Sequence, residues 1–118
     1  MTTTMIEDEL TWVAACSVTD IPSPGARCVR TPQGNVALFR TGDGKLFALE
    51  DRCPHRGGPL SQGMVFGHRV ACPLHGMLFD LASGAAVAPD TGAARRYPVR
   101  CEGERVLVGL PVQRDEVV

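Results

Sequence analysis

The hydrophobic residues of this chain come in short runs, and their period is two rather than the 3.6 of an amphipathic helix. Residues 36–40 and 46–49 are two such runs, and Thr41-Gly-Asp-Gly44 lies between them. An Asp-Gly turn between two apolar runs is a strong short-range hairpin signal. The pattern therefore predicts a β-hairpin over residues 36–49.

The same alternation of apolar runs and turn residues continues through the chain. It predicts further strands at 27–31, 64–66, 69–72, 77–80, 95–100 and 105–110, separated by turns at 32–34, 67–68, 83–84 and 102–103. Thirteen glycines and nine prolines interrupt the pattern, and no helix longer than ten residues is indicated. Residues 60–63 are expected to form a single helical turn. The predicted fold class is all-β, a small antiparallel sandwich or barrel.

The length of 118 residues predicts one domain, and 44% hydrophobic residues are enough for a small core. We place the domain at residues 11–112 and expect frayed tails at 1–10 and 113–118. No nucleophile–base pair, phosphate-binding loop or nucleotide fingerprint is present. A chain of this size is therefore not expected to be a complete enzyme.

Two short blocks carry the candidate chemistry of this chain. Cys53-Pro-His55 is followed by Cys72-Pro-Leu-His75, so each block supplies one thiolate and one imidazole. Such a set can hold either a tetrahedral zinc or two bridged irons. Zinc sites usually pair Cys with Cys and His with His, whereas each block here is Cys followed by His, which favours iron and sulfide. Two neutral imidazoles in place of two thiolates reduce the negative charge of a [2Fe–2S] centre, so the centre accepts an electron more readily.

The sequence around these blocks, from Cys53 to Gly63 and from Cys72 to Asp80, closely resembles the two cluster-binding loops of Rieske proteins. The resemblance extends from Trp12 to about Leu110. Within that superfamily, the run His-Arg-Gly-Gly-Pro-Leu-Ser-Gln-Gly after Pro54 is most similar to the small subunit of assimilatory NAD(P)H-dependent nitrite reductase. Rieske ferredoxins that feed aromatic-ring dioxygenases share much of the same framework.

The resemblance implies one Rieske-type [2Fe–2S] cluster, with Cys53 and Cys72 on one iron and His55 and His75 on the other. It implies a chain that transfers electrons and is not catalytic alone. Its partner would be the large nitrite reductase subunit, which carries flavin and sirohaem and reduces nitrite to ammonium. The alternative is a free ferredoxin that passes electrons from a ferredoxin reductase to an aromatic-ring dioxygenase or similar oxygenase.

Four positions depart from the high-potential respiratory Rieske pattern. Gly58 and Leu74 stand where that pattern has two disulfide-forming cysteines, and Met77 and Phe79 stand where it has a Ser and a Tyr whose hydroxyls bond to cluster sulfur atoms. Without those donors the reduced, more negative cluster is less stabilised. We therefore expect a low reduction potential. Gly57, Gly58 and Gly76 are expected to supply positive φ or close approach beside the ligands.

The remaining residues refine this interpretation. Cys101 alternates with Val99, so we expect it on the core side; with Cys16 and Cys28 it is interpreted as an inert thiol. His68 is interpreted either as an exposed turn residue or as a surface contact or proton site. The net charge of −1 gives no reason to expect nucleic acid. No apolar run approaches the ~20 residues of a membrane span, and residues 1–10 lack the pattern of a signal peptide, so we expect a cytoplasmic protein with no membrane contact.

Overall fold

The structure is a computed structural model, and it describes residues 10–54, 57–74 and 76–112. In these ranges the chain forms short antiparallel strands and two 3₁₀ helices, Val18–Asp20 and Leu60–Gln62. The strands are β1 (Leu10–Ser17), β2 (Gly25–Thr31), β3 (Gly34–Arg40), β4 (Leu46–Glu50), β5 (Met64–Phe66), β6 (Arg69–Ala71), β7 (Leu78–Asp80), β8 (Arg96–Tyr97), β9 (Val99–Glu102) and β10 (Arg105–Pro111). The predicted all-β class and the single turn near Leu60 are confirmed.

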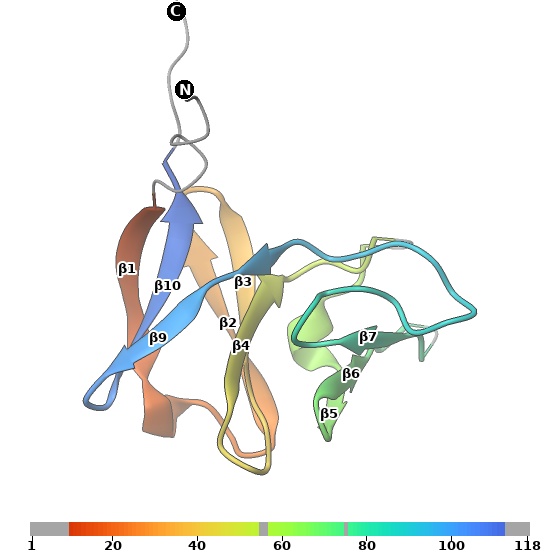
Figure 1. The fold of residues 1–118 in the computed structure, drawn as a ribbon, viewed down its shortest axis with the longest axis horizontal. Coiled ribbons are helices and arrows are strands. Elements are labelled where there is room, and N and C mark those ends of the chain that lie inside the picture. The colour runs from red at the N-terminus through yellow and green to blue at the C-terminus, as the bar shows by residue number, and fades with distance from the viewer. Residues whose placement is uncertain (1–9, 55–56, 75, 113–118) are drawn as a thin grey trace, which may run out of the picture.

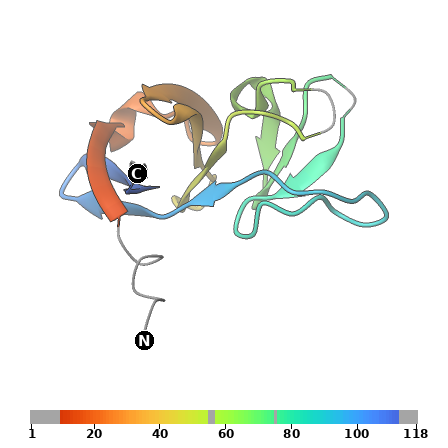
Figure 2. The ribbon, with the colours of Figure 1, turned by 90° about the horizontal axis from the view of Figure 1, so that it is seen from above.

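Two sheets enclose a common interior and form what we call the barrel (Figures 1 and 2). One sheet has the strand order β1-β10-β9 and the other β2-β3-β4-β8. Their inward side chains and that of Ile21, which follows the first 3₁₀ helix, form one buried cluster. It comprises Ile21, Val36, Leu38, Ala48, Tyr97, Val106, Val108 and Leu110. The hairpin predicted over 36–49 is confirmed as β3 and β4, with Val36 opposite Glu50 and Arg40 opposite Leu46.

A separate three-stranded sheet, β5-β6-β7, lies beside the barrel and is called here the small sheet (Figure 1). It is inserted between β4 and β8, which are neighbours in the barrel. The chain leaves the barrel after Glu50 and returns at Arg95, and the Glu50 amide donates to the Arg95 carbonyl at 2.7 Å. The small sheet is therefore a long excursion from one edge of the barrel.

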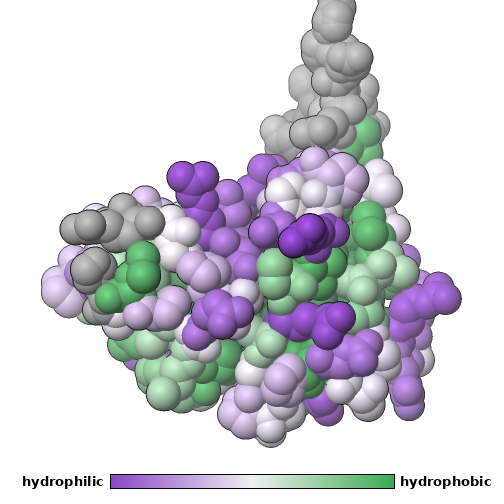
Figure 3. Space-filling model, turned by 180° about the vertical axis from the view of Figure 1, so that it is seen from behind, coloured by the Kyte–Doolittle hydropathy of each residue, from purple (hydrophilic) through white to green (hydrophobic). Residues whose placement is uncertain are grey.

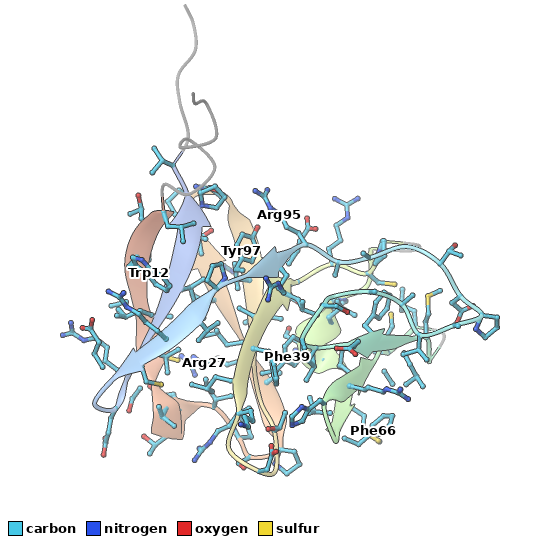
Figure 4. The ribbon with its side chains drawn as sticks, in the orientation of Figure 1. Trp12, Arg27, Phe39, Phe66, Arg95 and Tyr97 are labelled. Atoms are coloured by element: carbon cyan, nitrogen blue, oxygen red, sulfur yellow. The ribbon has the colours of Figure 1, made fainter. Side chains whose placement is uncertain are left out.

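Strand β3 is buried on both faces, which explains its uninterrupted apolar run. Val36 and Leu38 point into the barrel, whereas Ala37 and Phe39 point outward and pack against the small sheet. Alternate residues of a strand face opposite sides, so a strand between two cores must be apolar at every position. A second core joins the barrel to residues 51–94, which we call the insert. This core comprises Ala37, Phe39, Leu49, Cys53, Leu60, Val65, Val70, Cys72, Phe79, Leu81 and Ala94. Phe39 is labelled in Figure 4.

Three expectations need correction or qualification. The strand predicted at 95–100 is divided at Pro98: β8 pairs with β4, whereas β9 pairs with β10 in the other sheet. Proline has no N–H for a sheet ladder, and this break lets the chain change sheets. Leu10, placed in the first tail, opens β1 opposite Pro111; residues 1–9 and 113–118 lie outside the described residues.

Cys101 is exposed rather than buried. It does share a row with the buried Val106 of β10, but β9 is the last strand of its sheet, and among the described residues no further strand pairs with its other edge. Cys28 is also exposed, and Cys16 is partly buried. Among the described residues no helix has the length and apolar character that crossing a membrane requires.

Candidate metal centre

The two predicted cysteine ligands come from loops at the end of the small sheet. Cys53 follows β4 at the start of the first loop, residues 53–58, and Cys72 follows β6 at the start of the second loop, residues 72–77. Both side chains are almost fully buried, at 2% and 3% exposure, and they belong to the same core cluster. None of the five cysteines, all in the described part of the chain, takes part in a disulfide.

The two loops have the same internal hydrogen bonds. In the first, the Cys53 amide donates to the Gly58 carbonyl at 2.8 Å, and the Gly57 amide donates to the Cys53 carbonyl at 2.8 Å. In the second, the Cys72 amide donates to the Met77 carbonyl at 2.8 Å, and the Gly76 amide donates to the Cys72 carbonyl at 2.9 Å. Each loop is thus a tight turn that begins at a cysteine and closes five residues later.

Glycine is required where these turns reverse. Gly57 and Gly76 stand four residues after their cysteines, with φ of +74° and +72°. A side chain disfavours this left-handed conformation, whereas glycine adopts it readily. The expectation of positive φ beside the ligands is confirmed at both positions.

Gly58 and Leu74 bring the two loops into contact. A Cβ added at Gly58 would lie 2.8 Å from the Cγ and Cδ1 of Leu74, and 3.5 Å from the Sγ of Cys72. The first loop therefore passes directly over the Cys72 sulfur. Leu74 fills the space between the loops and still leaves about half of its surface exposed, at 52%.

Met77, the last residue of the second loop, and Phe79, two residues further on, bring no hydroxyl to this loop. Phe79 is fully buried in the core that contains Cys53 and Cys72, and Met77 packs against the same core. The environment of the two sulfurs on this side is thus apolar. A low-dielectric surrounding without added donors disfavours a gain of negative charge.

The base of the first loop is closed by side chains. One carboxylate oxygen of Asp51 accepts a hydrogen bond from the Ser61 amide at 2.7 Å, and the other accepts one from the Ser61 hydroxyl at 2.7 Å. Partial burial, and then a hydrogen bond with Asp51, raise the pKa of the nearby Cys28 thiol above its usual value. Local sequence pattern does not indicate this pair, because Asp51 and Ser61 lie ten residues apart and no motif links them.

His68 is an exposed turn residue, as the first of its two interpretations expected, and it contacts Asp43 and Phe47 of the barrel. Its Nε2 lies 3.0 Å and 3.2 Å from the two carboxylate oxygens of Asp43 in the β3–β4 turn. Its ring packs on Phe47 at a centroid distance of 5.4 Å. A hydrogen bond from the Thr41 hydroxyl, then one with His68, lower the pKa of Asp43 to about 2.

The other two predicted ligands, His55 and His75, lie outside the described residues. The described part of the site, with Cys53, Cys72 and the loops around them, fits a [2Fe–2S] group. Two buried sulfurs arrive from two matching loops that touch each other, and the neighbouring backbone turns need glycine rather than bulkier residues. Cysteine thiolates are the usual protein ligands of iron–sulfur clusters.

Comparison with known proteins gives a consistent assignment. The family model of the Rieske-like [2Fe–2S] domain matches residues 11–109. A naphthalene 1,2-dioxygenase ferredoxin component from Pseudomonas aeruginosa is 33% identical over 100 residues, which cover 84% of this chain and 95% of that protein.

Two solved structures share the fold over their whole length. One, described as an NADH-dependent nitrite reductase small subunit from Mycobacterium tuberculosis, superposes with a TM-score of 0.82 at 25% identity, covering 90% of this chain and 100% of that chain. The other, a ferredoxin from Sphingomonas yanoikuyae B1, gives 0.77 at 28% identity and covers 86% of this chain and 100% of that chain. These matches show that the whole fold is shared, and the family model with the ferredoxin relative identifies the cofactor as one Rieske-type cluster. The chain belongs to the family of Rieske-like [2Fe–2S] domains.

Proposed function

We propose that this chain is the electron-transferring small subunit of an NAD(P)H-dependent nitrite reductase. In this proposal Cys53 and Cys72 hold one iron of the cluster, and His55 and His75 hold the other. The cluster supplies one-electron redox chemistry when bound. The chain's own residues bury the sulfur ligands, fix the two loops and present the cluster end to a partner. Nitrite would be reduced to ammonium on the large subunit, which carries flavin and sirohaem.

The observation that carries the proposal is the fold match to the Mycobacterium tuberculosis small subunit, with a TM-score of 0.82 over the whole of that chain. The run from His55 to Gly63 supports it, because this first-loop sequence resembles the nitrite reductase small subunits most. A cytoplasmic location belongs to the proposal, since NAD(P)H supplies the electrons there.

The surface of the insert supports a function in which another protein is bound. Met64 and Leu74 are exposed at 70% and 52%, and Phe66 at 44%. Figure 3 shows hydrophobic side chains on the side of the molecule that carries the small sheet as well as over the barrel, and Figure 4 shows Phe66 at the end of β5. Exposed apolar residues that gather on one part of a small protein are characteristic of interaction sites.

A second candidate function is that of a free ferredoxin that delivers electrons to an aromatic-ring dioxygenase. The observation that favours it is the 33% identity to the naphthalene dioxygenase ferredoxin component over 95% of that protein. The two functions differ in the partner, which is a permanent sirohaem subunit in one case and a transiently bound oxygenase in the other.

The test is to tag the chain, purify it anaerobically from its own cells and identify what stays bound. We expect a large subunit with sirohaem absorption, and NAD(P)H-dependent nitrite reduction by the purified complex. A Cys53→Ser chain in the same complex separates electron transfer from a structural contribution, because it should bind the large subunit and lower the activity. A chain that purifies without a sirohaem protein and reduces an oxygenase would overturn the proposal.

A further inference from the structure

The two cysteine loops are alike inside but differ at their bases. The second loop stands at the tip of a hairpin, where Ala71 of β6 pairs with Leu78 of β7 directly below it. The first loop has no such pair, since it runs from the end of β4 to the 3₁₀ helix Leu60–Gln62. Below the Cys53–Gly58 hydrogen bond that closes this loop, a contact other than a strand ladder must therefore hold its two flanking segments together.

The Asp51–Ser61 contact occupies the place of the missing ladder. Asp51 lies two residues before Cys53, and Ser61 lies three residues after Gly58, so the pair brackets the whole first loop. Both carboxylate oxygens are engaged by Ser61 at 2.7 Å, one by its backbone amide and one by its hydroxyl. Hydrogen bonds to an ionised carboxylate are about twice as strong as neutral ones, and two from one residue also fix the orientation.

Asp51 is itself held by the barrel, so the contact has a rigid support. Its backbone amide donates to the Asn35 carbonyl at 3.0 Å, in the first residues of β3. On the other side, the Leu60 side chain beside Ser61 is fully buried in the core that contains Cys53. The contact thus ties the end of the first loop to the barrel strand from which the loop departs.

We propose that Asp51 and Ser61 are a positioning pair that closes the first loop and holds Cys53 in place for the cluster. The inference goes beyond the proposed function, because it applies to either partner, and it relies on Cys53 as a cluster ligand. Neither residue is proposed to bind iron. Their contribution is to the lifetime of the cluster and to the uniformity of its geometry.

The test uses the holoprotein and compares the two loops within one molecule. Asp51→Ala should raise hydrogen–deuterium exchange in residues 53–61 while exchange in residues 72–77 stays as in the wild type, because β6–β7 pairing closes the second loop. Release of iron to a chelator should become faster by roughly tenfold or more, because both hydrogen bonds to the Asp51 carboxylate are lost and one such bond alone accounts for about tenfold. The EPR lines of the reduced protein should broaden, since a looser Cys53 loop samples several geometries.

Two further variants keep the result interpretable if Asp51→Ala folds poorly. Ser61→Ala removes the hydroxyl but keeps the amide bond, so its iron release should lie between wild type and Asp51→Ala. Asp51→Asn keeps an acceptor for the Ser61 amide and should restore part of the wild-type lifetime. In the double variant Asp51→Ala/Ser61→Ala, the free-energy effects of the two substitutions on iron release should not add, because both residues act through one contact.

Asp80→Ala is the matched control. Asp80 also accepts two backbone amides, from Ala82 at 2.8 Å and Ser83 at 3.2 Å, but in the turn after β7. It should leave the exchange of residues 53–61 at the wild-type level. The proposal fails if Asp51→Ala releases iron at the wild-type rate, or if it raises exchange equally in both loops. A Cys53→Ser chain that retains a normal cluster would instead remove the ligand assignment on which the pair depends.

Discussion

Two single side chains, Met77 and Phe79, determine whether hydroxyl donors are present at the end of the second loop. Neither offers a hydroxyl, and Phe79 is fully buried in the core around the cysteines. A hydrogen bond to a cluster sulfur stabilises the reduced form, whose negative charge is larger. An apolar residue at each position leaves that stabilisation absent.

We therefore expect a reduction potential near the low end of the Rieske range, about −150 mV rather than toward +300 mV. Met77→Ser combined with Phe79→Tyr should raise the potential by tens of millivolts, where about 59 mV is a tenfold change in a one-electron equilibrium. Spectroscopic redox titration measures this shift.

Phe66→Tyr is the control for that experiment, since it adds the same hydroxyl on the exposed outer side of β5. It should not change the potential. A wild-type potential above about +200 mV, still within the known Rieske span, would contradict the argument from missing donors.

The ligand assignment gives a second prediction at this scale. Cys53→Ser and His75→Ala should each abolish the normal visible and EPR spectra of the cluster and lower the thermal stability, because metal-binding energy contributes to folding. Cys101→Ser should leave both spectra unchanged, as Cys101 lies exposed on β9, far along the chain from either loop. Bleaching by Cys101→Ser with retention of the cluster in His75→Ala would refute the assignment.

At the scale of elements, the junction between the 3₁₀ helix Leu60–Gln62 and β5 has no room for a side chain. A Cβ at Gly63 would lie 2.1 Å from the Ala71 carbonyl oxygen of β6. Gly63→Ala should therefore destabilise the protein by at least about 1–3 kcal/mol, the usual range for overpacking, because a backbone atom cannot move aside cheaply.

Gly42→Ala provides the comparison, since nothing lies within 4 Å of a Cβ at that position and its φ is not positive. It should be close to neutral in urea denaturation followed by circular dichroism. Equal stability of the two variants would show that the β5–β6 hairpin adjusts more freely than its packing indicates.

The Asp43–His68 contact between two turns predicts a dependence on acid. The pKa of Asp43 is lowered from 3.8 to about 2 in the folded protein. A carboxyl with a depressed folded-state pKa adds stability that is complete above its unfolded pKa and is lost as pH falls toward the folded one. The stability difference between wild type and Asp43→Asn should therefore be constant above about pH 4–5 and shrink between pH 4 and pH 2.

NMR titration of the Asp43 carboxyl tests the cause directly. In His68→Ala the pKa of Asp43 should rise from about 2 but stay below 3.8, because the Thr41 hydroxyl, the larger contributor, remains. Asp90→Asn controls for removing a carboxylate from an exposed loop. A stability difference that stays unchanged from pH 5 to pH 2 would contradict the link between this contact and folding.

Local sequence pattern predicted most of the strands and turns. It could not predict contacts between residues that are distant in the sequence. The hairpin at 36–49 and the glycines at 57 and 76 follow from rules that act within a few residues. The exposure of Cys101 depends on β9 being an edge strand, which a period of two does not reveal. The Asp43–His68 contact joins residues 25 apart, and nothing near either residue indicates the other.

The candidate site was predictable to the same extent and for the same reason. The spacing of Cys53 and Cys72 with their following histidines predicts the ligand set from local sequence, and the structure describes the two cysteines of that set. The contact of Gly58 with Leu74 and the closure by Asp51 and Ser61 arise only when the two loops and the barrel are assembled. The shape of the site is therefore a tertiary property, whereas its donor atoms are a property of the sequence.

At the scale of the whole molecule, the core around Cys53 and Cys72 also joins the insert to the barrel. Removing iron and sulfide with a chelator under reducing conditions should thus loosen the insert before the barrel. Hydrogen–deuterium exchange should rise in residues 57–94 while β1 and β10 stay protected, because their inward side chains pack in the other core. Loss of protection in both parts at once would show that the barrel does not fold without the cofactor.

The point at which the insert leaves the barrel has a consequence for protein engineering. Glu50 and Arg95 are joined by a backbone hydrogen bond of 2.7 Å, and the strands they end are neighbours. The insert is therefore one enlarged loop between the neighbouring barrel strands β4 and β8. Replacing residues 51–94 by a two-residue turn would close an ordinary hairpin, provided that the outward Ala37, Phe39 and Leu49 are made polar. By the same geometry, we expect that residues 51–94 can be transferred to another protein. A suitable recipient would be a barrel with two adjacent antiparallel strands and an apolar outer face.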